Sequence, residues 1–183
     1  MTDESDVDAI VVVRELQGRY PSGHGAPVEV VEVTDLRQLP DWFRPAVLWT
    51  EPLLDRTGEV TAQLREITTV DPATAAEPLD GFINQLYRSL KNARVGEELG
   101  ALLDAQEALP HWLQFVFNVY GRVRPYNKWL AWELREHPLP VELDLGLRHD
   151  LHAWFRWTEA LAREAGLGAV VDGWEPDLAW LRG

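Results

Sequence analysis

The stretch Asp6-Val7-Asp8-Ala9-Ile10-Val11-Val12-Val13 decides the fold class of this 183-residue chain. Its apolar run is short and rich in β-branched residues, which favours a buried strand over a helix across residues 8–13. Most of the chain that follows has helical periodicity instead. The sequence therefore predicts an α+β protein, in which a small β-containing part precedes a helical part.

The sequence beyond this strand predicts more β-structure. Residues 28–33 read Val-Glu-Val-Val-Glu-Val, which indicates a second strand whose alternation slips at Val30-Val31, as a bulge would produce. Ala46-Val47-Leu48-Trp49 predicts a third strand. Residues 60–67 predict a short helix, and the Gly- and Pro-rich residues 18–27 predict a loop.

An Ala- and Thr-rich linker between Pro72 and Pro78 marks the expected domain boundary, so the first domain is predicted to cover residues 1–71. The second, residues 79–183, is predicted to be a bundle of about five helices. Pro110 is expected to open one of these helices. Apolar residues recur at helical spacing in three stripes, namely Phe82, Ile83, Leu86, Tyr87 and Leu90, then Leu99, Leu102 and Leu103, then Trp154, Trp157 and Leu161.

Composition excludes several classes of protein. A net charge of −13 argues against a binder of duplex nucleic acid, which needs a basic face. No apolar run reaches the roughly 20 residues of a membrane helix. Cysteine is absent and the acidic start does not resemble a secretory signal, so we expect a cytoplasmic protein. Residues 81–135 form a locally basic island that could hold phosphates.

Two carboxylates at the first strand are candidates for metal binding. Asp6 and Asp8 stand two residues apart, so in a strand both leave the same face, roughly 6–7 Å from each other. Mg²⁺ prefers hard oxygen ligands and keeps waters and substrate phosphates in its shell, so two or three carboxylates suffice. Glu29 and Glu32 on the second predicted strand are both available as a third acid, which would complete a two-metal site.

These residues resemble a known family. The run Asp3-Glu4-Ser5-Asp6-Val7-Asp8 followed by Ala9-Ile10-Val11-Val12-Val13 resembles the Ser-Asp-x-Asp-hydrophobic strand of polymerase-beta-type nucleotidyltransferases. By that resemblance, Asp6, Asp8 and Glu29 are the catalytic acids that bind Mg²⁺ and, through it, a nucleoside triphosphate. Glu32 remains open as the third acid. The expected fold is then a truncated, nucleotidyltransferase-type mixed β-sheet followed by the helical bundle.

The helical half carries a second resemblance. The segments Leu86-Tyr87-Arg88-Ser89-Leu90-Lys91-Asn92 and Gly121-Arg122-Val123-Arg124-Pro125-Tyr126-Asn127-Lys128-Trp129-Leu130 are similar to the C-terminal helical domain of bacterial aminoglycoside-modifying nucleotidyltransferases. The resemblance implies cations for the triphosphate or pyrophosphate and aromatic rings that stack on the base. The candidate cations are Lys128, Arg124, Arg122, Arg88, Lys91 and Arg94, and the candidate rings are Tyr126 and Trp129.

The function implied is transfer of a nucleoside monophosphate from a nucleoside triphosphate to a hydroxyl of a small molecule. Members of the family also carry a Gly-Ser pair before the Asp-x-Asp strand, which here would lie upstream of Met1. The expectation divides accordingly. Either the true start lies upstream, or the chain is an inactive homologue acting as a helical binding or interaction protein. In the second case a second copy could cover the sheet edge and give a homodimer.

Overall fold

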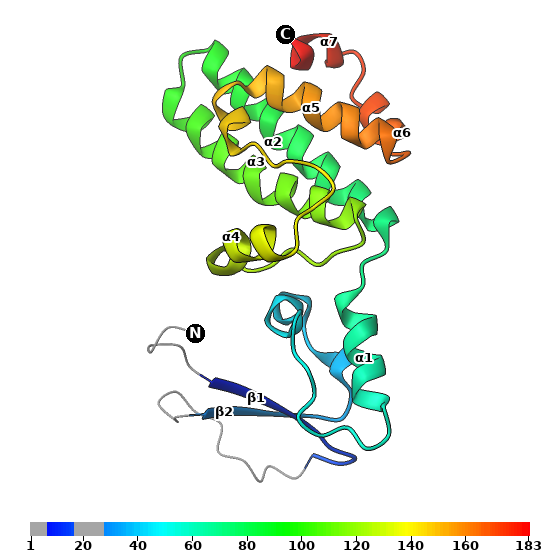
Figure 1. Cartoon of the computed structure of the whole chain (residues 1–183). Helices are drawn as coiled ribbons and strands as arrows, with labels where there is room; N and C mark the ends of the chain where they lie inside the picture. The colour runs from blue at the N-terminus through cyan, green and yellow to red at the C-terminus, as the bar shows by residue number, and fades with distance from the viewer. Residues whose placement is uncertain (1–6, 17–27) are drawn as a thin grey trace. The chain divides into compact units, whose positions relative to one another are not determined.

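The computed structural model of the chain describes residues 7–16 and 28–183, and gives the backbone alone for residues 7, 8 and 28–30. The fold is α+β, mostly helical with one small sheet (Figure 1). The chain divides into two compact units, Met1–Thr69 and Val70–Gly183. Residues 72–78, expected to be a linker, instead form η3 (Pro72–Ala75) and the first residues of α2 (Ala76–Arg94) in the second unit. Asp6 and the predicted loop over residues 18–27 lie outside the described residues.

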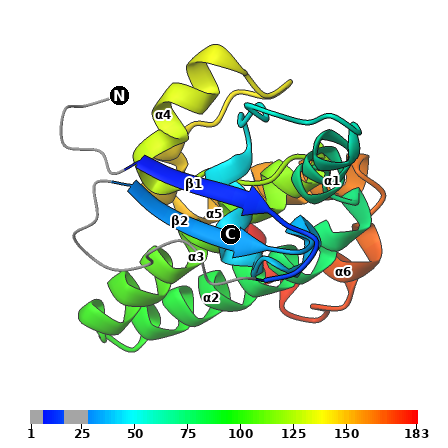
Figure 2. The same ribbon diagram turned by 90° about the horizontal axis from the view of Figure 1, so that it is seen from below.

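Two parallel strands form the sheet of the first unit. β1 (Val7–Val12) and β2 (Val28–Val33) lie side by side and run in the same direction (Figure 2). Their register is continuous from Val7 opposite Val28 to Val12 opposite Val33. The bulge expected at Val30-Val31 was therefore wrong. A pair of adjacent valines suits a strand that carries apolar residues on both faces.

The third strand expected at Ala46-Val47-Leu48-Trp49 was also wrong. A 3-10 helix, η2 (Asp41–Val47), ends within this run, and the chain turns after it. Pro45 has no backbone N–H for a strand ladder, whereas its fixed φ suits a helical turn. Val47 is 2% exposed and Trp49 is 52% exposed, although both would face the same side of a strand.

The predicted short helix is confirmed as α1 (Glu59–Thr68). It follows Gly58, whose φ of 75° favours glycine. The Asp55 carboxylate accepts hydrogen bonds from the backbone N–H groups of Gly58, at 2.9 Å, and Thr61, at 2.8 Å. Hydrogen bonds from Thr61, backbone and then side chain, lower the pKa of Asp55. Leu64 and Ile67 of α1 pack with Leu36 and Val47 to form a small buried apolar core in this unit.

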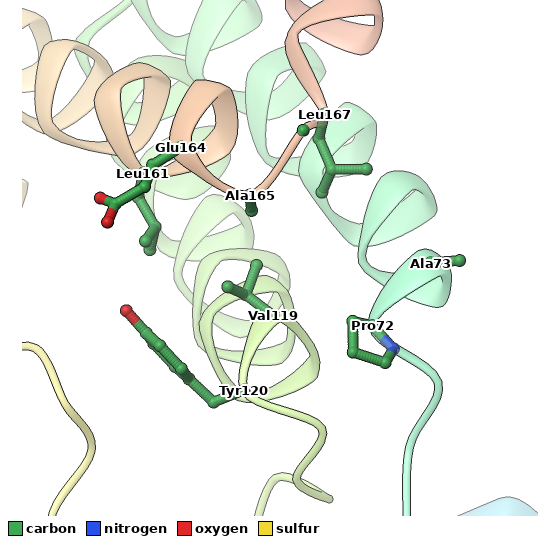
Figure 3. A pocket seen from close by; sticks show the side chains of 9 residues that line it. Pro72, Ala73, Val119, Tyr120, Leu161, Glu164, Ala165 and Leu167 are labelled. Carbon is green, nitrogen blue, oxygen red and sulfur yellow. The ribbon is translucent and has the colours of Figure 1, made fainter.

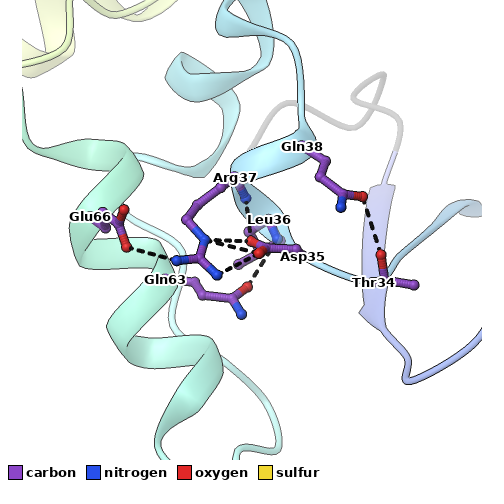
Figure 4. A network of polar contacts seen from close by, with 7 residues as sticks. All are labelled: Thr34, Asp35, Leu36, Arg37, Gln38, Gln63 and Glu66. Carbon is purple, nitrogen blue, oxygen red and sulfur yellow. Dashed lines mark hydrogen bonds and ion pairs between the residues drawn. The ribbon is translucent and has the colours of Figure 1, made fainter.

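A polar network fixes the turn that follows β2 (Figure 4). Within η1 (Leu36–Gln38), the Arg37 guanidinium binds the Asp35 carboxylate and lies 3.6 Å from Glu66 of α1. The side-chain oxygen of Gln63, a residue only 5% exposed, accepts the backbone N–H of Leu36 at 2.9 Å. The network thus ties α1 to the turn and satisfies a buried backbone donor.

The regular elements described in the second unit are all helices, and the long antiparallel pair of α2 and α3 is its framework (Figure 1). In order they are η3 (Pro72–Ala75), α2 (Ala76–Arg94), α3 (Glu98–Val119), α4 (Asn127–Glu136), η4 (Leu145–His149), α5 (Leu151–Glu164), α6 (Gly168–Asp172) and α7 (Leu178–Arg182). Helix α5 packs on α2, and α6 and α7 pack on α5. None of the helices in the described ranges combines the length and apolar character needed to cross a lipid bilayer.

The helix predicted to open at Pro110 was wrong in its start, because Pro110 lies inside α3. The helix runs through it as a single element of 22 residues, although proline removes one backbone donor from the helical ladder. The side chain of Pro110 is exposed, so it takes up no space in the core. Beyond Pro110, α3 buries an apolar face, with Trp112, Leu113, Phe115 and Val116 at most 3% exposed.

The first half of α3 turns a polar face to α2. Ser89 donates to the carbonyl of Ala101 at 2.7 Å, and Asn92 donates to the Asp104 carboxylate at 2.7 Å. The predicted stripe of Leu99, Leu102 and Leu103 is helical, yet these side chains are 70%, 55% and 51% exposed. Helical spacing therefore identified the element here without identifying its buried side.

A carboxylate on α5 links the C-terminal helices. Glu159, whose side chain is 11% exposed, accepts hydrogen bonds at 2.8 Å from Nε of Arg182 and at 2.9 Å from Nε of Arg163. Arg163 in turn donates to Asp172 at 2.7 Å. Hydrogen bonds from Arg182, and then from Arg163, lower the pKa of Glu159.

Glu159→Gln is expected to lower the free energy of unfolding by about 1–2 kcal/mol at pH 7, because charge-assisted hydrogen bonds are lost. A carboxylate with a lowered folded-state pKa stabilises above its unfolded pKa of about 4.3, and loses this stabilisation as the pH falls through the folded value. The difference between wild type and variant should therefore shrink in acid. Urea titrations at several pH values measure it, with exposed Glu107→Gln as the control. If the stability difference between wild type and Glu159→Gln stayed the same down to acid pH, the ionised Glu159 carboxylate would not be its source.

Candidate functional site

The predicted metal ligands belong to the first unit. In the parallel ladder, the Cα of Asp8 is the partner of the Cα of Glu29, whereas Glu32 is opposite Val11. Partnered positions on neighbouring strands share a face of a sheet. The backbone therefore favours Glu29 over Glu32 as the third acid, and Glu32 already has an interaction of its own. Asp6 lies outside the described residues, and the side chains of Asp8 and Glu29 do as well.

Where side chains are described, from residue 9 to 16 and from 31 onward, no three His, Asp or Glu residues gather as metal ligands would. The predicted Mg²⁺ ligands fall outside that set. The carboxyl groups of Asp8 and Glu29 are hard oxygen donors, which is the chemistry that Mg²⁺ selects.

Arg122, predicted to bind phosphate, lies just after α3 and holds the end of α4 in place. Its guanidinium pairs with the carboxylate of Glu133, which is 1% exposed, and donates to the carbonyl of His137 at 2.8 Å. Its Cζ atom also lies 5.5 Å from the ring centre of Phe117. Both terminal nitrogens of the guanidinium and one of its faces are therefore engaged, which fixes the position of the Arg122 side chain.

Arg124 and Lys128 flank the first residue of α4, Asn127. Arg124 donates from Nη2 to the side-chain oxygen of Asn127, while its buried Nε has no hydrogen-bond partner among the described residues. Burial lowers the pKa of the Arg124 guanidinium. The exposed Lys128 places its Nζ 5.7 Å from the ring centre of Trp129. The helix begins without a side-chain cap at Tyr126, so backbone N–H groups there can meet an anion.

The other predicted cations are remote from this pair. Arg88 lies on α2, 3.4 Å from the Asp104 carboxylate of α3, and Lys91 and Arg94 are exposed one and two turns further on. Asp104 precedes the end of α3 by fifteen residues, which is about 22 Å at 1.5 Å per residue. The structure therefore does not bring the two groups of cations together.

The two rings expected to stack on a base occupy the same turn. Trp129 is 40% exposed and meets Trp132 edge to face, with ring centres 6.4 Å apart. Tyr126 is half-buried and has an interaction of its own. Trp129 thus presents a partly open aromatic face beside Lys128.

Sequence reasoning missed a pocket of about 500 Å³ in the helical unit (Figure 3). Tyr120, at the end of α3, and Glu164, in the last turn of α5, supply its polar groups. Burial, and then the charge of Glu164, raise the pKa of the Tyr120 hydroxyl. These residues are 44 positions apart, so no local pattern could have paired them. Of the predicted apolar stripes, only that of Trp154, Trp157 and Leu161 includes a residue that lines the pocket, namely Leu161.

Comparison of the chain with protein-family models, with curated proteins and with solved structures finds no match.

Proposed function

We propose that the protein is a metal-dependent nucleotidyltransferase, which transfers a nucleoside monophosphate from a nucleoside triphosphate to a hydroxyl of a small molecule. The observation that carries the proposal is the pairing of Asp8 with Glu29 in adjacent parallel strands. Two carboxyl positions on one face, with Asp6 two residues before Asp8, make a suitable set for Mg²⁺. The sheet would then be the remnant of a nucleotidyltransferase-type sheet.

The chemistry assigned to these residues is positioning and charge neutralisation. Asp6, Asp8 and Glu29 would hold Mg²⁺, which would supply positive charge against the triphosphate when bound. The oxygen of the acceptor hydroxyl forms a bond to the α-phosphorus as the bond to the β-phosphate breaks, and the hydroxyl proton is lost to solvent. Pyrophosphate leaves with the negative charge that develops. Within the helical unit, Arg124 and Lys128 are the cations we assign to phosphate binding. Arg122 is assigned a structural role, because Glu133 and the carbonyl of His137 engage it.

Calorimetric titration of the 183-residue protein with Mg²⁺-ATP tests the proposal. We expect saturable heat that requires Mg²⁺, that is lost in Asp8→Asn with Glu29→Gln, and that is unchanged in the control Glu15→Gln on an exposed position after β1. Binding that is absent, or equal in the acidic double variant, contradicts the proposal.

The acceptor is tested separately, by release of pyrophosphate from ATP in the presence of a panel of aminoglycosides. The acid-rich chain suits a cationic acceptor. Release that depends on both acceptor and Mg²⁺, and that stops in Asp8→Asn, supports transfer. Binding of ATP without release supports nucleotide binding alone.

The second candidate is a catalytically inactive helical binding protein, possible also as a homodimer. One observation favours it: two predicted phosphate ligands, Arg122 and Arg88, form ion pairs with Glu133 and Asp104. In the described residues, each strand of the sheet has a single neighbour, so an outer edge of each is available to a second copy. Light scattering gives the oligomeric state, and an absence of Mg²⁺-ATP binding would favour this candidate.

A further inference from the structure

The pocket of the helical unit combines apolar walls with one carboxylate. Its walls come from η3, from the end of α3 and from the end of α5, and include Pro72, Val119, Leu161 and Leu167. Figure 3 shows the Glu164 carboxylate and the Tyr120 hydroxyl at one end of the pocket, with Pro72 and Leu167 at the other. The volume, about 500 Å³, falls within the range of small-molecule sites.

The charge of the pocket is negative. Glu164 is the charged residue among those that line it, and it is exposed, so it is accessible to a ligand. The neighbouring cation Arg163 does not line the pocket, and Glu159 and Asp172 engage its guanidinium at 2.9 Å and 2.7 Å. Without a basic group in the lining, an anionic ligand would meet uncompensated repulsion.

Tyr120 adds a second feature that favours a cation. Its ring is half-buried in the pocket wall, and an aromatic face attracts organic cations within about 6 Å of its centre. The phenol is neutral at physiological pH because the ordinary pKa of tyrosine is about 10, and burial raises it further, so the hydroxyl does not add negative charge. A neutral hydroxyl beside a carboxylate can also accept a hydrogen bond from an ammonium group.

We propose that this pocket binds a small organic amine, with its ammonium group between Glu164 and Tyr120 and its apolar body against Pro72, Val119 and Leu167. None of the residues that line the pocket is assigned to nucleotide or metal binding, so the pocket does not depend on nucleotidyl transfer. Because Glu164 is the single charged residue in the lining, the ligand expected is an amine with one positive charge and a compact hydrocarbon body.

The test compares three probes of matched size, namely 2-phenylethylamine, 2-phenylethanol and 3-phenylpropionate, by ¹H–¹⁵N correlation spectra of the full chain. We expect amide shifts at Gly166 and Leu167, with affinity highest for the amine, lower for the alcohol and lowest for the carboxylate. Equal affinity for the three probes, or shifts that avoid these residues, would overturn the proposal.

Variants locate the recognition. Glu164→Gln should weaken amine binding about two- to fivefold, the size expected of an exposed ion pair, and leave binding of the alcohol unchanged. Tyr120→Leu should weaken amine binding by a similar factor, whereas Tyr120→Phe keeps the ring and should retain most of it. Ala165→Trp should block the pocket for both ligands. Glu107→Gln, an exposed carboxylate elsewhere on α3, is the control, and an effect equal to that of Glu164→Gln would refute the role of Glu164.

Discussion

Replacement of Arg122 by methionine is expected to lower the free energy of unfolding of the helical unit by about 3–5 kcal/mol. Glu133, its ionic partner, is 1% exposed. Methionine fills similar space but leaves the carboxylate without the guanidinium that neutralises it. Burial of an uncompensated charge costs far more than the loss of an exposed ion pair. The carbonyl of His137 would lose a hydrogen bond of 2.8 Å as well.

Urea unfolding followed by circular dichroism at 222 nm measures this loss, because the helices of the second unit dominate the signal. Arg135→Met is the matched control, since the side chain of Arg135 is 68% exposed and pairs with the exposed Glu136. It should change stability by no more than about 0.5 kcal/mol. Arg122→Met with Glu133→Leu should recover most of the loss, because both charges are then absent.

The same variant separates two roles of Arg122. If the residue chiefly bound phosphate, Arg122→Met would fold normally and lose affinity for Mg²⁺-ATP. If it is structural, stability falls, and Arg122→Lys rescues it only in part, because an ammonium group cannot reproduce the planar fork that reaches Glu133 and the carbonyl of His137. A loss below about 1 kcal/mol in Arg122→Met would contradict the structural role.

Local sequence patterns predicted the helices and strands of this fold better than they predicted which elements pack together. The β-branched runs identified β1 and β2, and the residues of α1 had the composition of a short helix. The run at Ala46-Val47-Leu48-Trp49 was misassigned because four apolar residues do not distinguish a strand from a helical turn. Pro45 suits the helical turn, and the burial of Val47 with the exposure of Trp49 does not fit a strand.

The candidate site shows the same division. Asp8 and Glu29 could be proposed as neighbours from strand patterns and family resemblance, and the parallel register places them opposite each other. The use of Arg122 by Glu133 could not be predicted, because it depends on how the chain returns after leaving α3. A basic residue in a sequence gives a charge, and only the packing shows whether a buried acid already neutralises it.

Three aromatic rings hold the centre of the helical unit, and their truncation gives the second large effect. Trp154 of α5 is 1% exposed and meets Phe82 of α2 and Trp112 of α3 edge to face, with ring centres 5.1 Å and 5.5 Å apart. Trp154→Ala is expected to cost about 3–5 kcal/mol, because it removes buried apolar surface and leaves a cavity between three helices.

The indole ring of Trp154 also lowers stability in one respect, which a smaller ring would remove. The indole nitrogen of Trp154 is buried, and within the part of the chain that the structure describes it has no hydrogen-bond partner. Trp154→Phe keeps most of the edge-to-face packing and removes this unpaired donor. We expect it to cost about 1–2 kcal/mol, well below the loss in Trp154→Ala. Trp129→Ala, at a residue 40% exposed, is the control for loss of an indole outside the core.

Thermal and urea unfolding of the three variants rank them. The expected order of stability is wild type, then Trp129→Ala and Trp154→Phe, and last Trp154→Ala. If Trp154→Phe were as damaging as Trp154→Ala, the shape of the indole itself would hold the helices together, because the cavity alone would not explain the loss. If Trp154→Ala were tolerated, the three helices would not depend on this cluster, and the packing of α5 on α2 would have to rest on its flanking contacts.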